Sequence, residues 1–247
     1  MDITIENKHV LLNSNIHKEI SYSPEIDFYS LASEQILPIV LPEFGAIAGE
    51  NPIIFVKDNT SGRFKAAALY GLMPEQNLSV TAEKWTSNYM PKAVRNQHFK
   101  LHKSMVNSPG QASSNSNDDF DLSFDASLTQ FTSPKGERLF SDAGHETSFL
   151  KNIKNNLIQY LHASHHTDMF LQTIATLGLL APNKLTVDVL GKKIDVEGLF
   201  LINEEKFSQL SHEQFIKLRE QDYLSAIYSH FISLNHALSL AKKAAKV

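Results

Sequence analysis

Three histidines and an aspartate form the most ligand-like group in this chain: His162, His165, His166 and Asp168. Because His162 and His166 are four residues apart, a helix would place both imidazoles on one face, where such a pair can bind zinc. The sequence defines no third ligand beside them, and histidines near a helix end commonly interact with the last carbonyl groups. We therefore interpret the group as a solvated junction between two helices, and we expect no metal site.

Crowded aspartates could instead bind calcium, and four of them lie between residues 118 and 125: Asp118, Asp119, Asp121 and Asp125. A calcium loop of the helix–loop–helix type also needs a glycine at its turn and a glutamate at its end, and both are missing here. We interpret the segment as a solvated acidic loop. The sequence also contains no nucleophile elbow, dinucleotide turn or phosphate loop. A catalytic triad built from distant residues stays open, because geometry and not spacing defines it.

A recognition surface is the third kind of chemistry, and its candidates are Trp85, Tyr89 and Arg95. These residue types combine large contact area with directed hydrogen bonds, and they dominate interface hot spots. The alternative is that Trp85 is a packing residue and that Arg95 pairs with an acid such as Glu43. We predict that Glu43, Trp85, Tyr89 and Arg95 are the binding residues, with no catalytic residue among them.

Composition restricts the classes of function. The chain has 247 residues, 42% of them hydrophobic, and its net charge of -4 does not favour nucleic acid as a partner. It has no cysteine, so disulfides and thiolate zinc sites are excluded. Acidic residues interrupt the first eight positions before any apolar signal region, and no apolar run approaches the roughly 20 residues that span a bilayer. We expect a cytoplasmic protein with no membrane span and no cofactor.

The pattern along the chain predicts an α+β fold. Residues 52–57 and 63–72 read as strands joined by the turn-rich segment 58–62, and residues 66–68, all alanine, suit a strand interior that another element approaches closely. Residues 107–136 read as a polar loop whose second half offers docking residues: Phe120, Leu122, Phe124, Leu128 and Phe131. We treat 1–247 as one domain, with subdomains 1–106, mostly β, and 137–247, mostly α, on either side of this loop.

The second subdomain changes to helical periodicity. Apolar residues at four-residue spacing predict a helix over 149–161, and Thr167 and Asp168 resemble the N-cap of a second helix. Residues 185–189 and 194–202 flank Gly191 as a hairpin, and residues 211–214 fit a capping box. A later helix carries apolar residues from 224 to 238, and the lysines after it suit its C-terminal end. The expected architecture is thus a mainly antiparallel sheet followed by helices with one hairpin.

The order of several short segments resembles the SapC family of bacterial proteins. The matching segments are Pro42 to Phe44, Pro52 to Phe55, the block of Trp85, Tyr89, Pro91 and Arg95, Gly136 to Phe140, Gly178 to Leu180, and Gly198 to Asn203. Together they extend from about residue 8 to residue 240. The chain departs from the family pattern at His98, where members usually carry proline, and in the expanded loop after residue 107. A transporter permease shares the family's name, but the absence of an apolar spanning segment argues against that meaning.

The resemblance implies a bacterial protein with a surface-layer-associated name, and it implies no catalytic residues. Members of the family often occur beside halogenase and oxygenase genes. Three hypotheses follow. The first is a non-catalytic accessory protein that binds a peptide or protein partner. The second is an enzyme that acts on a small molecule or peptide in a pathway linked to those oxygenases, and the third is a structural part of a surface layer.

Overall fold

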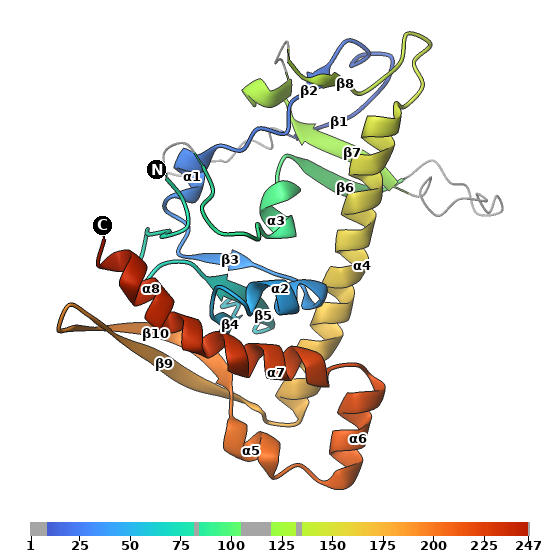
Figure 1. Cartoon of the computed structure of the whole chain (residues 1–247). Helices are drawn as coiled ribbons and strands as arrows, with labels where there is room; N and C mark the ends of the chain where they lie inside the picture. Colours follow the sequence, from blue (N-terminus) through green and yellow to red (C-terminus); the bar gives the residue numbers. More distant parts are fainter. Residues whose placement is uncertain (1–8, 82–83, 105–119, 132–134, 247) are drawn as a thin grey trace. The chain divides into compact units, whose positions relative to one another are not determined.

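The computed structural model describes residues 9–81, 84–104, 120–131 and 135–246 (Figure 1). The chain divides into two compact units, and each unit combines two separate stretches of sequence. The first is Met1–Ile26 with Arg95–Leu161, and the second is Asp27–Val94 with His162–Val247. The expected loop at 107–136 therefore lies inside the first unit, and the single-domain and subdomain boundaries stay predictions.

The first unit contains two small antiparallel sheets and part of a long helix. One sheet has the strand order β1–β7–β6, and the other pairs β2 with β8. Their bounds are β1 His9–Leu11, β2 Ser21–Tyr22, β6 Phe99–Lys103, β7 Phe120–Asp125 and β8 Glu137–Arg138. The core of this unit gathers Tyr22, Phe99, Phe124 and Leu150 around neighbouring aromatic rings. Burial of such large rings is the main stabilising term in a unit of this size.

Strand β7 shows how the polar segment 107–136 acquires structure. Leu122, Phe124 and Phe131 are buried, so the prediction that this part docks on the core is confirmed. Alternation along β7 places Leu122 and Phe124 on the core face, which gives a strand where we expected an irregular loop. Two of the four acidic candidates, Asp121 and Asp125, belong to this strand. Asp118 and Asp119 lie outside the described residues.

The second unit is built on a five-stranded antiparallel sheet with the order β3–β5–β4–β10–β9. The strands are β3 Ile36–Pro38, β4 Ile53–Lys57, β5 Phe64–Leu69, β9 Leu180–Val189 and β10 Lys192–Ile202. Both predicted hairpins are confirmed, as β4–β5 and β9–β10. Ala66, Ala67 and Ala68 are buried in β5 between two partner strands, as their small side chains suggested. The second hairpin adds to the same sheet, because β10 pairs with β4.

Helix α4, Ser148–Thr176, corrects one sequence-based prediction. We expected two helices with an N-cap at Thr167 and Asp168, whereas α4 continues through both residues without a break. The Thr167 hydroxyl donates to the Ala163 carbonyl 2.6 Å away, and it accepts the Leu41 N–H at 2.8 Å. A threonine that bonds back to the preceding turn is compatible with a continuous helix, so the residue type alone misled the prediction.

Short helices complete the second unit and the boundary between the units. They are α1 Phe28–Leu31, η1 Leu41–Glu43, α2 Phe44–Ile47, α3 Lys92–Arg95, α5 Glu204–Ser208, α6 His212–Glu220, α7 Leu224–Ser233, η3 Leu234–His236 and α8 Ala237–Ala244; η2 Thr129–Phe131 belongs to the first unit. The predicted capping box is confirmed, because the Ser211 hydroxyl accepts the Gln214 N–H and Gln214 Oε1 accepts the Ser211 N–H. The mixed content of helices and antiparallel strands confirms the α+β class.

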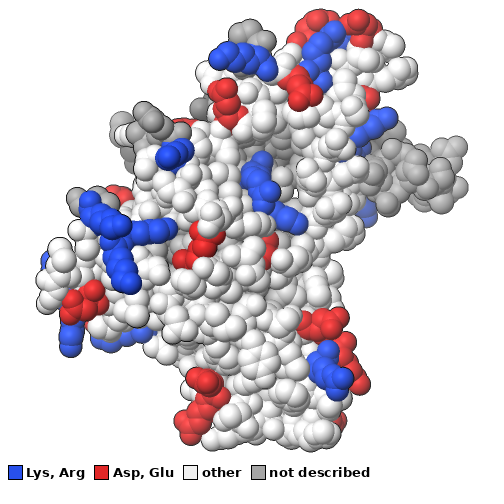
Figure 2. Space-filling view, in the orientation of Figure 1, with Lys and Arg blue, Asp and Glu red and all other residues white. Residues whose placement is uncertain are grey.

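Helices α7 and α8 pack along the sheet of the second unit (Figure 1). Leu240 and Ala241 of α8 are buried with Val187 of β9 and Val196 of β10. Lys242 and Lys243 follow in the last turn of α8, and Figure 2 shows basic side chains gathered where this helix ends. Among the described residues, no helix is both long enough and apolar enough to span a membrane.

Candidate functional site

The buried carboxylate of Glu43 connects three segments of the second unit. Glu43 is 1% exposed, and it follows Pro42 in η1. Its Oε2 accepts the Val40 N–H at 2.9 Å, which closes the turn that holds it. Its Oε1 accepts the Tyr89 hydroxyl at 2.9 Å and the Lys92 N–H at 2.7 Å. A buried carboxylate with several donors is satisfied internally, so Glu43 fixes the segment from Tyr89 to Lys92 onto η1.

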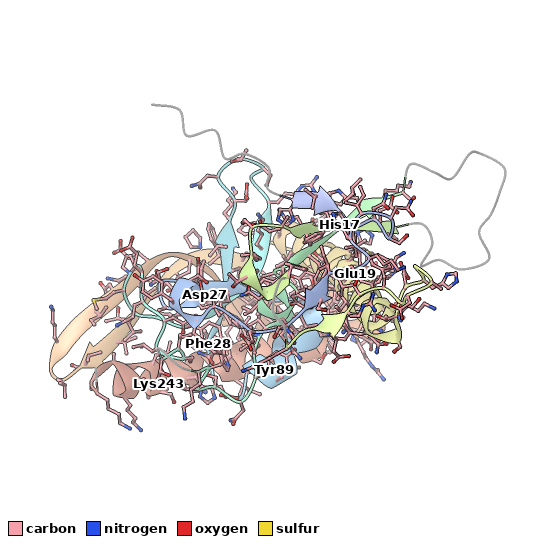
Figure 3. All side chains as sticks on the ribbon, turned by 90° about the horizontal axis from the view of Figure 1, so that it is seen from above. His17, Glu19, Asp27, Phe28, Tyr89 and Lys243 are labelled. Atoms are coloured by element: carbon pink, nitrogen blue, oxygen red, sulfur yellow. The ribbon has the colours of Figure 1, made fainter. Side chains whose placement is uncertain are left out.

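The loop that carries Trp85 and Tyr89 is fastened from within. The Trp85 indole N–H donates to the Tyr89 carbonyl at 3.1 Å, and the Trp85 ring lies edge-on to Tyr70 with ring centroids 5.1 Å apart. Tyr89, labelled in Figure 3, and Trp85 are half-buried, so part of each ring surface remains accessible. The structure thus brings together three of the four residues predicted to bind, in one hydrogen-bonded chain from Trp85 through Tyr89 to Glu43.

The fourth predicted binding residue, Arg95, is the last residue of α3 and is exposed. It is the first residue of the Arg95–Leu161 stretch and so belongs to the first unit, whereas Glu43, Trp85 and Tyr89 belong to the second. The donors that we find on the Glu43 carboxylate are a hydroxyl and two backbone N–H groups. The pairing of Arg95 with an acid and the role of all four residues in binding stay predictions.

The three histidines lie within the continuous helix α4, and not at a junction between two helices as we expected. His162, His165 and His166 are exposed, and the His166 ring packs near Tyr223 with centroids 5.6 Å apart. In the part of the chain that the structure describes, no group of three or more acidic or histidine side chains could hold a metal ion. The histidines are therefore interpreted as the solvated side of a long helix.

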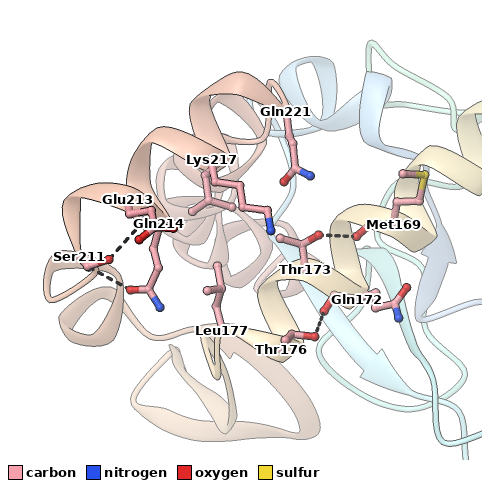
Figure 4. A pocket seen from close by; sticks show the side chains of 11 residues that line it. Met169, Gln172, Thr173, Thr176, Leu177, Ser211, Glu213, Gln214, Lys217 and Gln221 are labelled. Atoms are coloured by element: carbon pink, nitrogen blue, oxygen red, sulfur yellow. Dashed lines mark hydrogen bonds between the residues drawn. The ribbon is translucent and has the colours of Figure 1, made fainter.

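A groove between α4 and α6 is the site that the sequence did not indicate (Figure 4). Its volume is about 640 Å³, and its apolar lining includes Met169, Leu177 and Leu218. Polar side chains complete the lining: Gln172, Thr173, Thr176, Ser211, Glu213, Gln214, Lys217 and Gln221. The two threonine hydroxyls donate to carbonyl groups of α4 itself, and Gln214 belongs to the capping box. Half of these eight side chains, Thr173, Thr176, Ser211 and Gln214, therefore have partners already.

Gln221 differs from the other polar residues of the groove. Its Oε1 is buried and accepts no hydrogen bond from any described residue. Gln221 is the C-cap residue of α6, where its N–H bonds to the Lys217 and Arg219 carbonyls, so its backbone is held while its side-chain oxygen is unused. Leaving a buried acceptor unsatisfied costs about 1–3 kcal/mol. Such an atom calls for a specific explanation, and a ligand that donates an N–H group is one.

A second groove lies along the same helix. It has a volume of about 600 Å³, and β5 and the preceding turn contribute Gly62, Arg63 and Phe64 to its lining. Met169, Gln172 and Thr176 line both grooves. Met169 is 47% exposed although it is apolar. The exposed side of α4 thus offers an apolar residue with a groove on each side.

The fold and these grooves define a class of protein: an α+β protein whose candidate site is a helix-bordered groove of apolar and amide side chains. The family model for SapC matches residues 12–240, which is nearly the whole chain, and the chain belongs to the SapC family. The resemblance found in the sequence is thereby confirmed. No curated protein and no solved structure matches the chain.

Proposed function

We propose that this chain is an accessory protein of the SapC family that binds a peptide or protein partner, and that it holds a peptide segment in the groove between α4 and α6. The unused Oε1 of Gln221 carries the proposal. A peptide presents a backbone N–H at every residue except proline, so an extended segment in the groove would supply the missing donor once the Gln221 amide turns its oxygen into the groove. Filling that acceptor would remove a cost that the free protein carries.

The apolar lining supports a peptide over a purely polar ligand. Met169 is exposed at the groove, and the flexible thioether side chain of methionine adapts to partners of different shape. The volume of about 640 Å³ lies within the range of sites that take small ligands or single anchor side chains. We therefore expect the bound segment to combine a large apolar side chain with an adjacent free backbone N–H.

Lys217 adds a charge preference. Its side chain lines the groove together with Glu213 from the preceding turn of α6. Charged groups at the rim of an interface act mainly on association rate and specificity. A segment with an acidic residue on the Lys217 side is thus favoured, although the apolar anchor and the bond to Gln221 provide most of the affinity.

The test is a selection of peptides from a random displayed library against the whole chain, followed by titration calorimetry with the selected peptides. Replacing Gln221 by leucine or Met169 by aspartate should weaken groove-binding peptides at least tenfold. The matched control is Met73→Asp, because Met73 is 50% exposed in the same unit but does not line either groove. Selected peptides that bind the Gln221→Leu and Met169→Asp variants as tightly as the unchanged chain would overturn the groove proposal.

The sequence-based contact surface is a separate part of the proposal. Trp85 and Tyr89 keep accessible ring surface although their polar atoms are bonded internally. Aromatic residues held rigidly in this way lose little conformational entropy on binding. We propose that Trp85 and Tyr89 contact a protein partner, with Glu43 holding Tyr89 in place, and that Arg95 of the first unit is a separate contact residue.

A further inference from the structure

Two serines and a lysine form a hydrogen-bonded chain in the second unit, away from the grooves. The Ser87 hydroxyl donates to Ser79 Oγ at 2.7 Å, and Lys243 Nζ donates to the same Oγ at 3.1 Å. Ser79 is fully buried, whereas Ser87 and Lys243 are half-buried. The order Ser87, Ser79, Lys243 thus leads from a partly accessible hydroxyl through a buried one to an amine.

The backbone around Ser79 keeps this arrangement in place. The Thr86 N–H donates to the Ser79 carbonyl at 2.8 Å, which positions Ser87 opposite Ser79. The Leu78 N–H donates to the Tyr70 carbonyl at 2.8 Å and ties the segment to the end of β5. A Cβ at Gly71 would lie 1.9 Å from the Gln76 carbonyl oxygen, so only glycine permits this close turn. Backbone hydrogen bonds therefore fix the positions of the two segments that carry the Ser79 and Ser87 hydroxyls.

Lys243 reaches this chain from the last turn of α8, and it is labelled in Figure 3. Burial lowers the pKa of Lys243 below the usual lysine range, and the opposing charge of Glu50 offsets part of that shift. Glu50 is itself engaged, since both its carboxylate oxygens accept the Asn88 N–H at 2.9 and 3.1 Å. A lysine whose ammonium form is disfavoured by burial can act as a base, which is how Ser–Lys sites activate a serine.

The side chain of Asn77 bonds to the backbone of Ser79. Asn77 Oδ1 accepts the Ser79 N–H at 2.9 Å, while Asn77 Nδ2 is buried and has no partner among the described residues. Asn77 thus helps to hold the backbone at Ser79 through its Oδ1.

We infer that Ser87 is a nucleophile for acyl transfer from a carboxylic ester or amide, with Ser79 as the proton relay and Lys243 as the base. For the reaction, unprotonated Lys243 Nζ must accept the Ser79 hydroxyl proton, which reverses the direction of the hydrogen bond between them. Ser87 Oγ forms a bond to the carbonyl carbon while its proton moves to Ser79 Oγ and the proton of Ser79 moves to Nζ of Lys243. When the bond to the leaving group breaks, the departing alcohol or amine takes that proton. Water then attacks the acyl-serine and its proton passes through Ser79 to Lys243. When the bond between Ser87 Oγ and the acyl carbon breaks, that proton returns through Ser79 to Ser87 Oγ and the carboxylic acid is released. This chemistry goes beyond the binding role and uses none of the groove residues.

The test uses a biotin-tagged fluorophosphonate on the whole chain. Ser87 Oγ forms a bond to phosphorus, fluoride leaves, and the serine proton passes to Lys243. Mass spectrometry should locate the label on Ser87, and Ser87→Ala or Ser79→Ala should lower labelling at least tenfold. The rate for the unchanged chain should rise with pH around a midpoint below the ordinary lysine value of roughly 10.4, because only neutral Lys243 is a base.

A matched pair of variants separates chemistry from structure. Lys243→Arg keeps a cation that can donate to Ser79, but arginine does not lose its proton in this range. Labelling should therefore fall at least tenfold in Lys243→Arg, and it should not change in Lys242→Arg, the exposed lysine one position earlier on α8. A folded chain whose Ser87 takes no label, or a Lys243→Arg variant labelled at the unchanged rate, would refute the inference. Labelling that is retained in Gln221→Leu shows that the result is independent of the groove.

Discussion

Two regions of the second unit differ in how their buried polar groups are hydrogen-bonded. Glu43 is satisfied by three donors, and His230, 0% exposed in α7, accepts the Ile202 N–H at 3.1 Å while its other ring nitrogen lies 2.9 Å from the Ile53 carbonyl oxygen. Gln221 in the α4–α6 groove instead keeps a buried oxygen without a described partner. The hydrogen bonds of the first region therefore stabilise the fold, whereas the second region has a free acceptor for which a partner can supply the donor.

This difference distinguishes residues whose types suggest function from residues that have an unsatisfied hydrogen-bonding atom. Glu43, Trp85 and Tyr89 attract attention by type, but their polar atoms are bonded to one another and to the backbone. Gln221 has an ordinary side chain at an ordinary helix end. Since satisfied groups contribute stability and unsatisfied ones cost it, truncation in the two regions should change the free energy of unfolding in opposite directions.

The largest effect is expected at Glu43. Glu43→Ala leaves the Val40 and Lys92 N–H groups and the Tyr89 hydroxyl without their acceptor, and we expect a loss of about 3–5 kcal/mol in the free energy of unfolding, as for other buried charged groups that lose their network. Urea denaturation measures it. Tyr89→Phe is the graded control, because it removes one of these bonds and should cost only about 1 kcal/mol. If both variants lose the same small amount, Glu43 does not fasten this region.

The next effect depends on pH and concerns His230. Burial lowers its pKa to about 4 from the ordinary value of 6.5. The Ile202 N–H needs an acceptor at Nε2, so the proton of the neutral ring lies on Nδ1 and is donated to the Ile53 carbonyl. The unfolded chain binds a proton at His230 more readily than the folded chain. Stability from this group is thus full above pH 6.5, and about 3 kcal/mol is lost as the pH falls to about 4.

Comparison with a variant isolates this contribution from the other histidines. His230→Gln lacks the titrating ring, so the difference in unfolding free energy between the two proteins should shrink as the pH falls from 6.5 to 4. Urea denaturation at several pH values provides the curves. A difference that is constant across this window would mean that His230 does not resist protonation in the folded state.

At Gln221 the expected change has the opposite sign. Leucine is similar in size to glutamine, and Gln221→Leu removes a buried acceptor that has no described partner. We expect the free energy of unfolding to rise by about 1 kcal/mol, the lower part of the cost of an unsatisfied group. Thermal unfolding measures the gain. A loss of stability would show that Gln221 Oε1 is satisfied in solution, and the contrast between the two regions would disappear.

The sequence predicts the fold better than the site, and particular residues show why. Alternation and turn residues predict both hairpins, and the Ser211 to Gln214 capping box is a local pattern that the structure repeats. Thr167 has the residue type of an N-cap, but in the structure its hydroxyl bonds to the Ala163 carbonyl of the preceding turn and to the N–H of Leu41, which is distant in sequence. The groove depends on α6 lying beside α4, and the Ser79 relay depends on α8 reaching the loop after β5. Contacts between elements that are distant in sequence produce no local pattern of residues, so the sequence does not predict them.

The smallest effect, and the finest distinction, concerns the surface around Trp85. Trp85 is the single tryptophan of the chain, so its fluorescence reports on that loop alone. Among the selected peptides, those that contact this surface should protect Trp85 from quenching by acrylamide, and their affinity should not change in Gln221→Leu. Groove peptides should show the reverse pattern. Lys100→Ala, a change at an exposed cation of the first unit, should affect neither class of peptide. If no selected peptide protects Trp85, Trp85 and Tyr89 serve only to hold the loop. Their internal hydrogen bonds then explain why these residue types occur there, and no role in binding is needed.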